Sequence, residues 1–86
     1  MKKTTRLQTV LGIASADAQA LFDSLTPAER EAVELLAKGS KVEEISSALG
    51  KSPKTIAVQL AAARFKLKAR NYVEMVRVVY AAQLGE

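Results

Sequence analysis

The chain has 86 residues, 49% of them hydrophobic, and contains neither cysteine nor histidine. This length suits one domain with a modest core, to which every helix must contribute. Without cysteine there is no disulfide framework and no thiolate metal site, and without histidine the commonest general base and metal ligand are absent. We therefore expect a protein of a reducing, cytoplasmic environment that carries no cofactor.

The net charge of +4 is unevenly distributed along the chain. Residues 51–86 carry seven lysines and arginines against two glutamates, whereas residues 1–50 carry six cations and seven acids. A basic C-terminal part is typical of a protein that binds a polyanion, although an ordinary solubilising surface gives the same pattern. We expect no membrane partner, because no apolar segment has the length needed to span a bilayer, and the run before Ser15 is too weak for a secretory signal.

Residues 5–24 show the spacing of an amphipathic helix. Its apolar stripe is formed by Leu7, Val10, Leu11, Ala14, Ala18, Leu21 and Phe22, followed by Leu25. Gly12 weakens the middle of this helix, so the alternative is two pieces, the second starting near Ser15. We expect residues 1–24 to be a helical extension that packs on the rest of the domain, with a dimerisation or partner-docking helix as the alternative.

The segment Thr26-Pro27-Ala28-Glu29 combines a capping box with a proline in the first turn, which predicts the start of a helix. This helix ends where Lys38 precedes Gly39, because glycine readily takes the left-handed conformation of a helix C-terminus. Its predicted buried face consists of Ala32, Val33, Leu35, Leu36 and Ala37. The acidic residues of this helix and the next are expected on solvated positions: Glu29, Glu31, Glu34, Glu43 and Glu44.

A short helix is predicted over Val42–Leu49 and ends at Gly50. Only Lys51 and Ser52 separate Gly50 from Pro53, where the next helix starts with Ser52 as its cap. Two helices joined by so tight a turn must cross steeply, as in a helix-turn-helix. The inward residues of the short helix are predicted to be Val42, Ile45, Ala48 and Leu49. Those of the next helix are Ile56, Leu60, Ala63 and Leu67, which leaves outward Lys54, Thr55, Ala57, Val58, Ala61, Ala62 and Arg64.

A final helix is predicted from Asn71, which can cap it while Glu74 completes the box, to about Gln83. The apolar residues of this helix cover more than one of its faces. We expect some of them to pack on the core and the remainder to form a surface for self-association. We expect the dimerisation surface of a homodimer to be formed by Tyr72, Val73, Val76, Val79 and Tyr80.

The sequence contains no nucleophile–base pair, no glycine-rich phosphate loop and no metal-ligand spacing, so we do not expect an enzyme. A helix-turn-helix instead indicates double-stranded DNA as the partner, with the second helix of the motif in the major groove. Phosphate contacts are expected from Ser52, Lys54 and Thr55 at the start of that helix and from Lys66, Lys68 and Arg70 beyond its middle.

The spacing of these signals resembles the LuxR/NarL/GerE-type helix-turn-helix without a gap. The matching elements are Leu25-Thr26-Pro27-x-Glu29-Arg30-Glu31, Leu35-Leu36-Ala37-Lys38-Gly39, Glu44-Ile45, Leu49-Gly50, Ser52-Pro53-Lys54-Thr55-Ile56, Lys66-Leu67 and Asn71-x-x-Glu74. The resemblance implies an all-α fold, with a four-helix LuxR-type domain over residues 25–86 and, in this chain, an additional N-terminal helix. It also implies a cytoplasmic, nucleoid-associated bacterial transcription regulator, usually dimeric through the last helix, with residues 53–67 as recognition helix.

The outward face of the recognition helix departs from the family pattern, because Gln59 stands where the family usually has a histidine. The residues expected in the groove offer only methyl groups: Ala57, Val58, Ala61 and Ala62. Methyl groups can contact thymine methyls but cannot make hydrogen bonds to bases. Two hypotheses therefore stay open: a DNA-binding transcription regulator, or a helix-turn-helix used for protein recognition, with RNA polymerase or another transcription factor as the partner.

Overall fold

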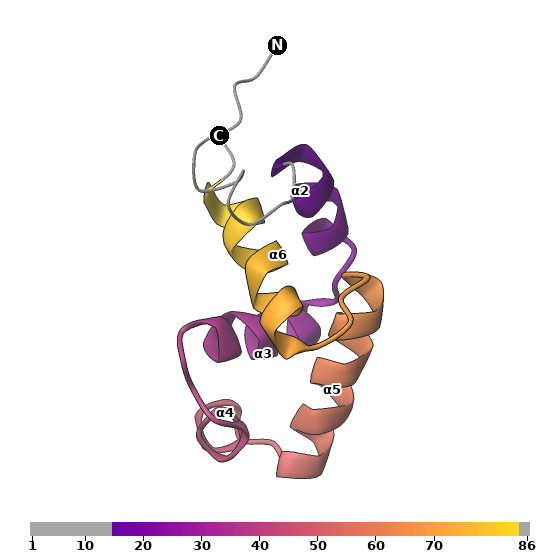
Figure 1. Ribbon diagram of the computed structural model, residues 1–86. Coiled ribbons are helices and arrows are strands. Elements are labelled where there is room, and N and C mark those ends of the chain that lie inside the picture. The colour runs from indigo at the N-terminus through magenta and orange to yellow at the C-terminus, as the bar shows by residue number, and fades with distance from the viewer. Residues whose placement is uncertain (1–14, 85–86) are drawn as a thin grey trace.

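The computed structural model describes residues 15–84, whose regular structure is all α-helical (Figure 1). The helices are α2 (Ser15–Asp23), α3 (Pro27–Ala37), α4 (Val42–Leu49), α5 (Pro53–Lys66) and α6 (Tyr72–Leu84). The four helices predicted after residue 25 are confirmed, and their bounds differ from the predicted ones only at the end residues. In the extension, the structure describes α2 over Ser15–Asp23, and the part of the helix predicted over residues 5–14 lies outside the described residues.

Side chains cap α3 and α5 as the sequence predicts. Thr26 Oγ1 accepts a hydrogen bond from the Glu29 N–H at 3.1 Å, and the Thr26 N–H donates to Glu29 Oε1 at 2.9 Å, which completes the capping box. Ser52 Oγ accepts from the Thr55 N–H at 3.1 Å. A cap of this kind stabilises a helix by about 1 kcal/mol, so both helices have well-defined starts.

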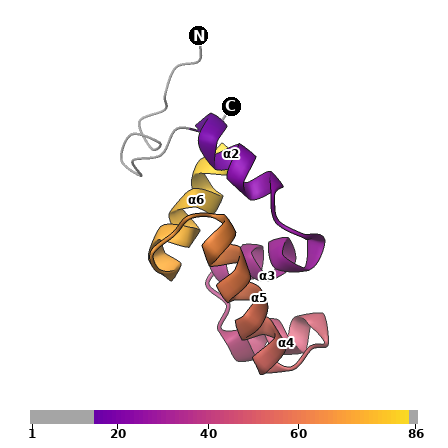
Figure 2. The same cartoon turned by 90° about the vertical axis from the view of Figure 1, so that its right-hand side faces the viewer.

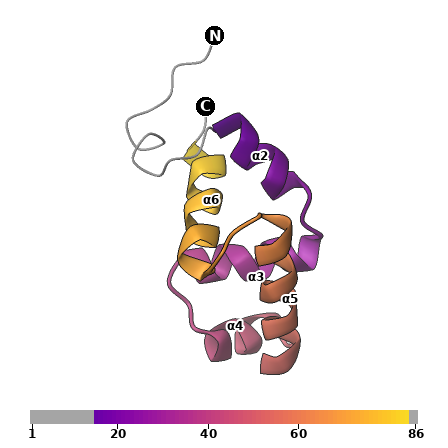
Figure 3. The same cartoon turned by 45° about the vertical axis from the view of Figure 1, so that its right-hand side comes forward.

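The turn between α4 and α5 is held by Gly50 and Ser46. Gly50 has φ +65°, in the left-handed region that glycine occupies without strain. The buried Ser46 hydroxyl donates to Lys51 O, and the Lys51 N–H donates to Ser46 O at 3.0 Å. As a result α4 lies across the N-terminal end of α5 and not alongside it (Figure 3), which confirms the predicted crossing.

One hydrophobic core joins all five helices. Its largest fully buried side chains are Ile45, Ile56, Leu60, Leu67, Met75, Val33 and Val79. The prediction for α4 is wrong at Ala48, which is exposed. The reason is that Ser46 takes an inward position to bind the turn, and this orientation of α4 turns Ala48 towards solvent.

The N-terminal helix α2 packs along the C-terminal half of α6, at the end of the molecule far from α4 (Figures 1 and 2). Ala18 and Phe22 of α2 are buried in the same core as Val78 and Ala82 of α6. The described part of the extension is therefore packed on the domain, as the first of the two alternatives predicted. None of the helices within residues 15–84 combines the length and the hydropathy that crossing a membrane requires.

Candidate nucleic-acid interface

Helix α5 has two sharply different faces. Ile56, Leu60 and Ala63 have no exposed surface and pack against α3 and α4, as predicted. On the opposite side no other part of residues 15–84 covers the helix, and Val58 is 61% exposed. Figure 2 looks at this side of the molecule, where α5 lies in front of α3. The helix is thus anchored along one side and free along the other.

The first turn of α5 combines several groups that favour an anion. Pro53 has no N–H, the Thr55 N–H is bonded to Ser52 Oγ, and the Ile56 N–H is bonded to Ser52 O at 3.1 Å. The Lys54 N–H is left without a partner among the described residues, and the exposed Lys54 ammonium is in no ion pair with them. Ser52 Oγ donates its own proton to Thr55 Oγ1 at 2.9 Å, so the Thr55 hydroxyl keeps a proton to donate. With the positive end of the helix dipole, this turn can bind a phosphate.

Lys66, predicted to contact phosphate, is already paired inside the protein. Its Nζ donates to Glu29 Oε1 at 2.8 Å, which ties the C-terminal end of α5 to the N-terminal end of α3. Glu29 was predicted to be solvated, but it is only 8% exposed. Burial raises the pKa of the Glu29 carboxyl, but the Lys66 ammonium and the hydrogen bonds from Thr26 outweigh burial and hold this pKa below its ordinary value. The prediction of a solvated Glu29 is wrong, and Glu29 and Lys66 form an ion pair between α3 and α5.

The connection from α5 to α6 carries the other two predicted cations. Lys68 is exposed, has φ +55°, and forms no ion pair with the described residues. Arg70 binds Glu74 through Nη2 at 2.6 Å and Nε at 2.8 Å, and these contacts hold the pKa of Glu74 below its ordinary value. Asn71 caps α6 as predicted, because its Oδ1 accepts a hydrogen bond from the Glu74 N–H at 2.9 Å. The predicted capping box is not completed, because Glu74 Oε1 accepts from the Arg70 N–H and not from the Asn71 N–H.

The middle of α5 is an apolar surface. The four residues predicted to face the bases lie on its outer side. Ala57, Val58 and Ala61 are exposed, and Ala62 is half-buried. Gln59 is half-buried, and its Oε1 is inside the protein without a hydrogen-bond partner. Arg64, predicted to point outward, is half-buried because its Nη1 donates to Ala69 O at 3.1 Å.

Phe65 was overlooked in the sequence, yet it is 82% exposed at the C-terminal end of α5. Its exposure could have been predicted from its spacing. Phe65 follows Val58 by seven residues, or about two helical turns, and so lies on the same side of the helix. The apolar surface of α5 therefore extends further than the predicted residues.

The charged residues of α5 and of the segments on either side of it in the sequence are all basic. The sequence has no acidic residue between Ile45 and Val73, a stretch that includes the whole of α5. Glu31 and Glu34 of α3 instead line a small hollow with Lys38, at the contact with α4. No group of three or more acidic, histidine or cysteine residues within residues 15–84 could hold a metal ion.

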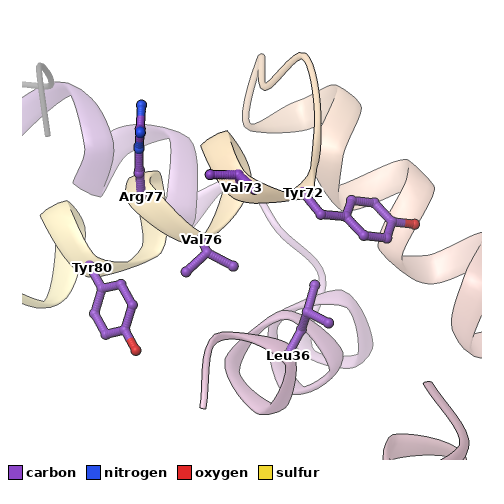
Figure 4. Close-up of a pocket in the computed structure, with 6 residues that line it drawn as sticks. All are labelled: Leu36, Tyr72, Val73, Val76, Arg77 and Tyr80. Carbon is purple, nitrogen blue, oxygen red and sulfur yellow. The ribbon is translucent and has the colours of Figure 1, made fainter. Parts of the chain in front are cut away.

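A second surface, on α6, gathers four of the five predicted dimerisation residues. A groove of about 450 Å³ between α6 and α3 is lined by Leu36, Tyr72, Val73, Val76, Arg77 and Tyr80. Figure 4 shows Val76 and Leu36 facing one another across it, with Tyr72 on one side and Tyr80 on the other, and the Tyr80 hydroxyl donates to Ala37 O at 2.7 Å. The prediction is wrong for Val79, which has no exposed surface because it is part of the hydrophobic core.

Comparison with known proteins agrees with this geometry. The model of a family described as bacterial regulatory proteins of the luxR family matches residues 23–79. The transcriptional regulatory protein UhpA of Escherichia coli (strain K12) is 45% identical over 58 residues, which cover 67% of this chain and 30% of that protein. UhpA of Salmonella typhimurium (strain LT2) is 47% identical over 53 residues, covering 62% of this chain and 27% of that protein. No solved structure matches the chain.

The chain spans less than a third of the length of either relative. The region that the family model matches includes α3, α4, α5 and most of α6. It contains the capped helix starts, the left-handed Gly50 turn and the outward face of α5 described above. The chain belongs to the luxR family of bacterial regulatory proteins.

Proposed function

We propose that this domain binds duplex DNA by placing the exposed side of α5 in the major groove. The observation that carries the proposal is the division of α5 into two faces. One face is fixed in the core by Ile56, Leu60 and Ala63, and the opposite face is left uncovered by the part of the chain that the structure describes. A rigidly held helix with a free outer side is the element that helix-turn-helix proteins insert into the groove. The names of both relatives, transcriptional regulatory proteins, support this use of the fold.

In this complex the two ends of α5 contact the phosphates. At the start of the helix, the free Lys54 N–H, the Lys54 ammonium and the Thr55 hydroxyl bind one phosphate group. Lys68, beyond the other end of α5, contacts the backbone on the far side of the groove. Lys66 takes no part, because its ammonium is held by Glu29.

The domain acts as a dimer through the groove on α6. Val73, Val76 and Tyr80 are apolar side chains with exposed or half-exposed surface around this groove, which a second copy of α6 would cover. Val76→Glu should abolish the dimer in sedimentation experiments because it places a charge at the centre of the contact. Gln83→Glu, an equal charge change on an exposed position of α6, should leave it intact, and equal behaviour of the two variants would contradict this interface.

DNA binding is tested by fluorescence anisotropy with a labelled duplex of mixed sequence over a range of salt concentrations. Each phosphate contact adds about 0.9 to the slope of log affinity against log salt, so Lys54→Ala and Lys68→Ala should each lower the slope by about that amount. Lys66→Met should leave the slope unchanged. Lys38→Ala, which removes a charge beside Glu31 and Glu34, is the control and should also leave it unchanged. Absence of duplex binding at low salt would refute the proposal.

A second candidate function is recognition of a protein, with RNA polymerase or another transcription factor as the partner. It is favoured by the exposure of Val58 and Phe65, large apolar side chains of the kind that protein interfaces cover. A pull-down from a bacterial extract with the wild type and with a Val58→Glu, Ala61→Glu variant tests it. Equal capture of partners by the two proteins would exclude it.

A further inference from the structure

Four residues form a straight line along the outer side of α5: Lys54, Val58, Ala61 and Phe65. They follow one another at intervals of four, three and four residues, which keeps them on one side of an α-helix. All four are exposed, and Val58 and Phe65 reach 61% and 82%. We call Val58, Ala61 and Phe65 the apolar strip; it begins one turn after the Lys54 ammonium.

The apolar strip has no polar group that could read a base by hydrogen bonds. Direct readout normally relies on arginine, lysine, asparagine or glutamine making paired hydrogen bonds to a base edge. The amide closest in sequence belongs to Gln59, whose Oε1 is buried in the protein. Arg64 is likewise engaged with Ala69 O. A helix that enters the groove with this face therefore discriminates bases through apolar contacts.

The charges around the apolar strip favour DNA over a protein as its occupant. No acidic residue lies between Ile45 and Val73, and Lys54 and Lys68 stand unpaired, among the described residues, before and after the strip. Cations at both ends of an apolar face complement a groove that has phosphates along both edges and bases between them. The apolar group that bases present in the major groove is the C5-methyl of thymine, and alanine and phenylalanine are among the residues that contact it.

We infer that the apolar strip makes this domain selective for thymine methyl groups, so that the half-site read by α5 has thymines facing Val58, Ala61 and Phe65. This inference rests on the proposed function. Along the helix axis, Val58 and Phe65 are about 10 Å apart at 1.5 Å per residue. Base pairs are stacked at about 3.4 Å, so the strip spans about three base-pair steps. The selectivity comes from methyl burial and needs no hydrogen bond to a base.

The experiment compares four defined duplexes that differ in the major-groove methyl group: alternating dA–dT, alternating dA–dU, alternating dG–dC, and alternating dG–dC with 5-methylcytosine. Uracil pairs as thymine does but lacks the methyl, and 5-methylcytosine carries one at the same ring position. Affinities are measured by anisotropy at low salt. We expect the wild type to bind the dA–dT duplex about fourfold more tightly than the dA–dU duplex for each methyl contacted, as about 0.8 kcal/mol per buried carbon gives. Methylation of cytosine should likewise raise affinity.

The variants separate this inference from the proposed function. Val58→Ala and Phe65→Ala alter exposed side chains, and each should reduce the ratio of dA–dT to dA–dU affinity towards one. Lys54→Ala is the control and should weaken binding to both duplexes equally, leaving the ratio unchanged. Equal affinity of the wild type for the dA–dT and dA–dU duplexes would overturn the inference while the proposed function stands. Failure to bind any of the four would overturn both and assign the strip to a protein partner.

Discussion

The ion pair between Glu29 and Lys66 should fix the position of α5 on α3, and Glu29→Gln tests this. The substitution keeps an acceptor for the Thr26 N–H, so the cap of α3 survives while the charge is lost. Glu29 is 8% exposed and the Lys66 side chain is 36% exposed, so this ion pair is partly buried. Exposed ion pairs contribute about 0–1 kcal/mol to stability, whereas breaking a buried pair costs about 3–5 kcal/mol. We expect the free energy of unfolding to fall by about 1–2 kcal/mol, and Tm by about 4–16 °C.

The measurement is a double-mutant cycle with Lys66→Met, using urea denaturation followed by circular dichroism. If the two side chains stabilise the fold through each other, the double variant should lose less stability than the sum of the single variants, with a coupling energy of at least about 0.5 kcal/mol. Glu31→Gln makes the same charge change on an exposed position of α3 and should alter stability by less than about 0.5 kcal/mol. A coupling energy of zero would show that the ion pair does not hold the helices together.

Three further predictions concern stability. Because the pKa of Glu29 in the folded protein lies below its ordinary value of 4.5, the stabilisation it provides is present above pH 4.5 and lost as the pH falls through the folded value. Thermal unfolding of Glu29→Gln should therefore depend less on pH in this range than that of the wild type, and parallel curves would contradict this. Gly50→Ala should cost about 1 kcal/mol in urea denaturation, because φ is +65° and an added Cβ meets no atom within 4 Å; Gly50→Asn should cost less, and equal losses would refute the conformational explanation. Phe22→Ala should cost about 3 kcal/mol in one cooperative transition if α2 belongs to the folded unit. An unchanged midpoint would show that it does not.

The fold could be predicted because its signals are local. Thr26 and Glu29 cap α3 within four residues, Ser52 and Pro53 start α5, and Gly50 ends α4, so each helix boundary is determined by neighbours in the sequence. The tight glycine turn then limits how α4 and α5 can cross. Periodicity alone was insufficient for the short α4, where two turns offer few positions and a buried serine replaced the expected Ala48.

The site was less predictable, because it depends on contacts between distant residues. Glu29 and Lys66 are 37 residues apart, and nothing in the sequence around Lys66 shows that its ammonium meets a buried carboxylate. The same limit applies to Val79, since an apolar helix such as α6 does not reveal which of its faces α2 will cover. Phe65 lies on the expected side of α5 but was missed because phenylalanine is usually assigned to the core.

The ion pair also changes the expected strength of DNA binding. Lys66 and Arg70 are in ion pairs, and Arg64 is hydrogen-bonded to Ala69 O. Among the described residues, the cations near α5 whose side chains are in neither kind of contact are Lys51, Lys54 and Lys68, so one copy should show a salt slope of only about −2 to −3. For so weak an electrostatic contribution, we propose that stable binding requires a second copy. Val76 lies on α6, away from the residues of α5 that are proposed to contact DNA. Val76→Glu should therefore weaken duplex binding in anisotropy measurements at least as much as Lys54→Ala does, because it disrupts the dimer. Unchanged affinity of a Val76→Glu monomer would mean that one copy binds DNA sufficiently by itself and that the groove on α6 has another role.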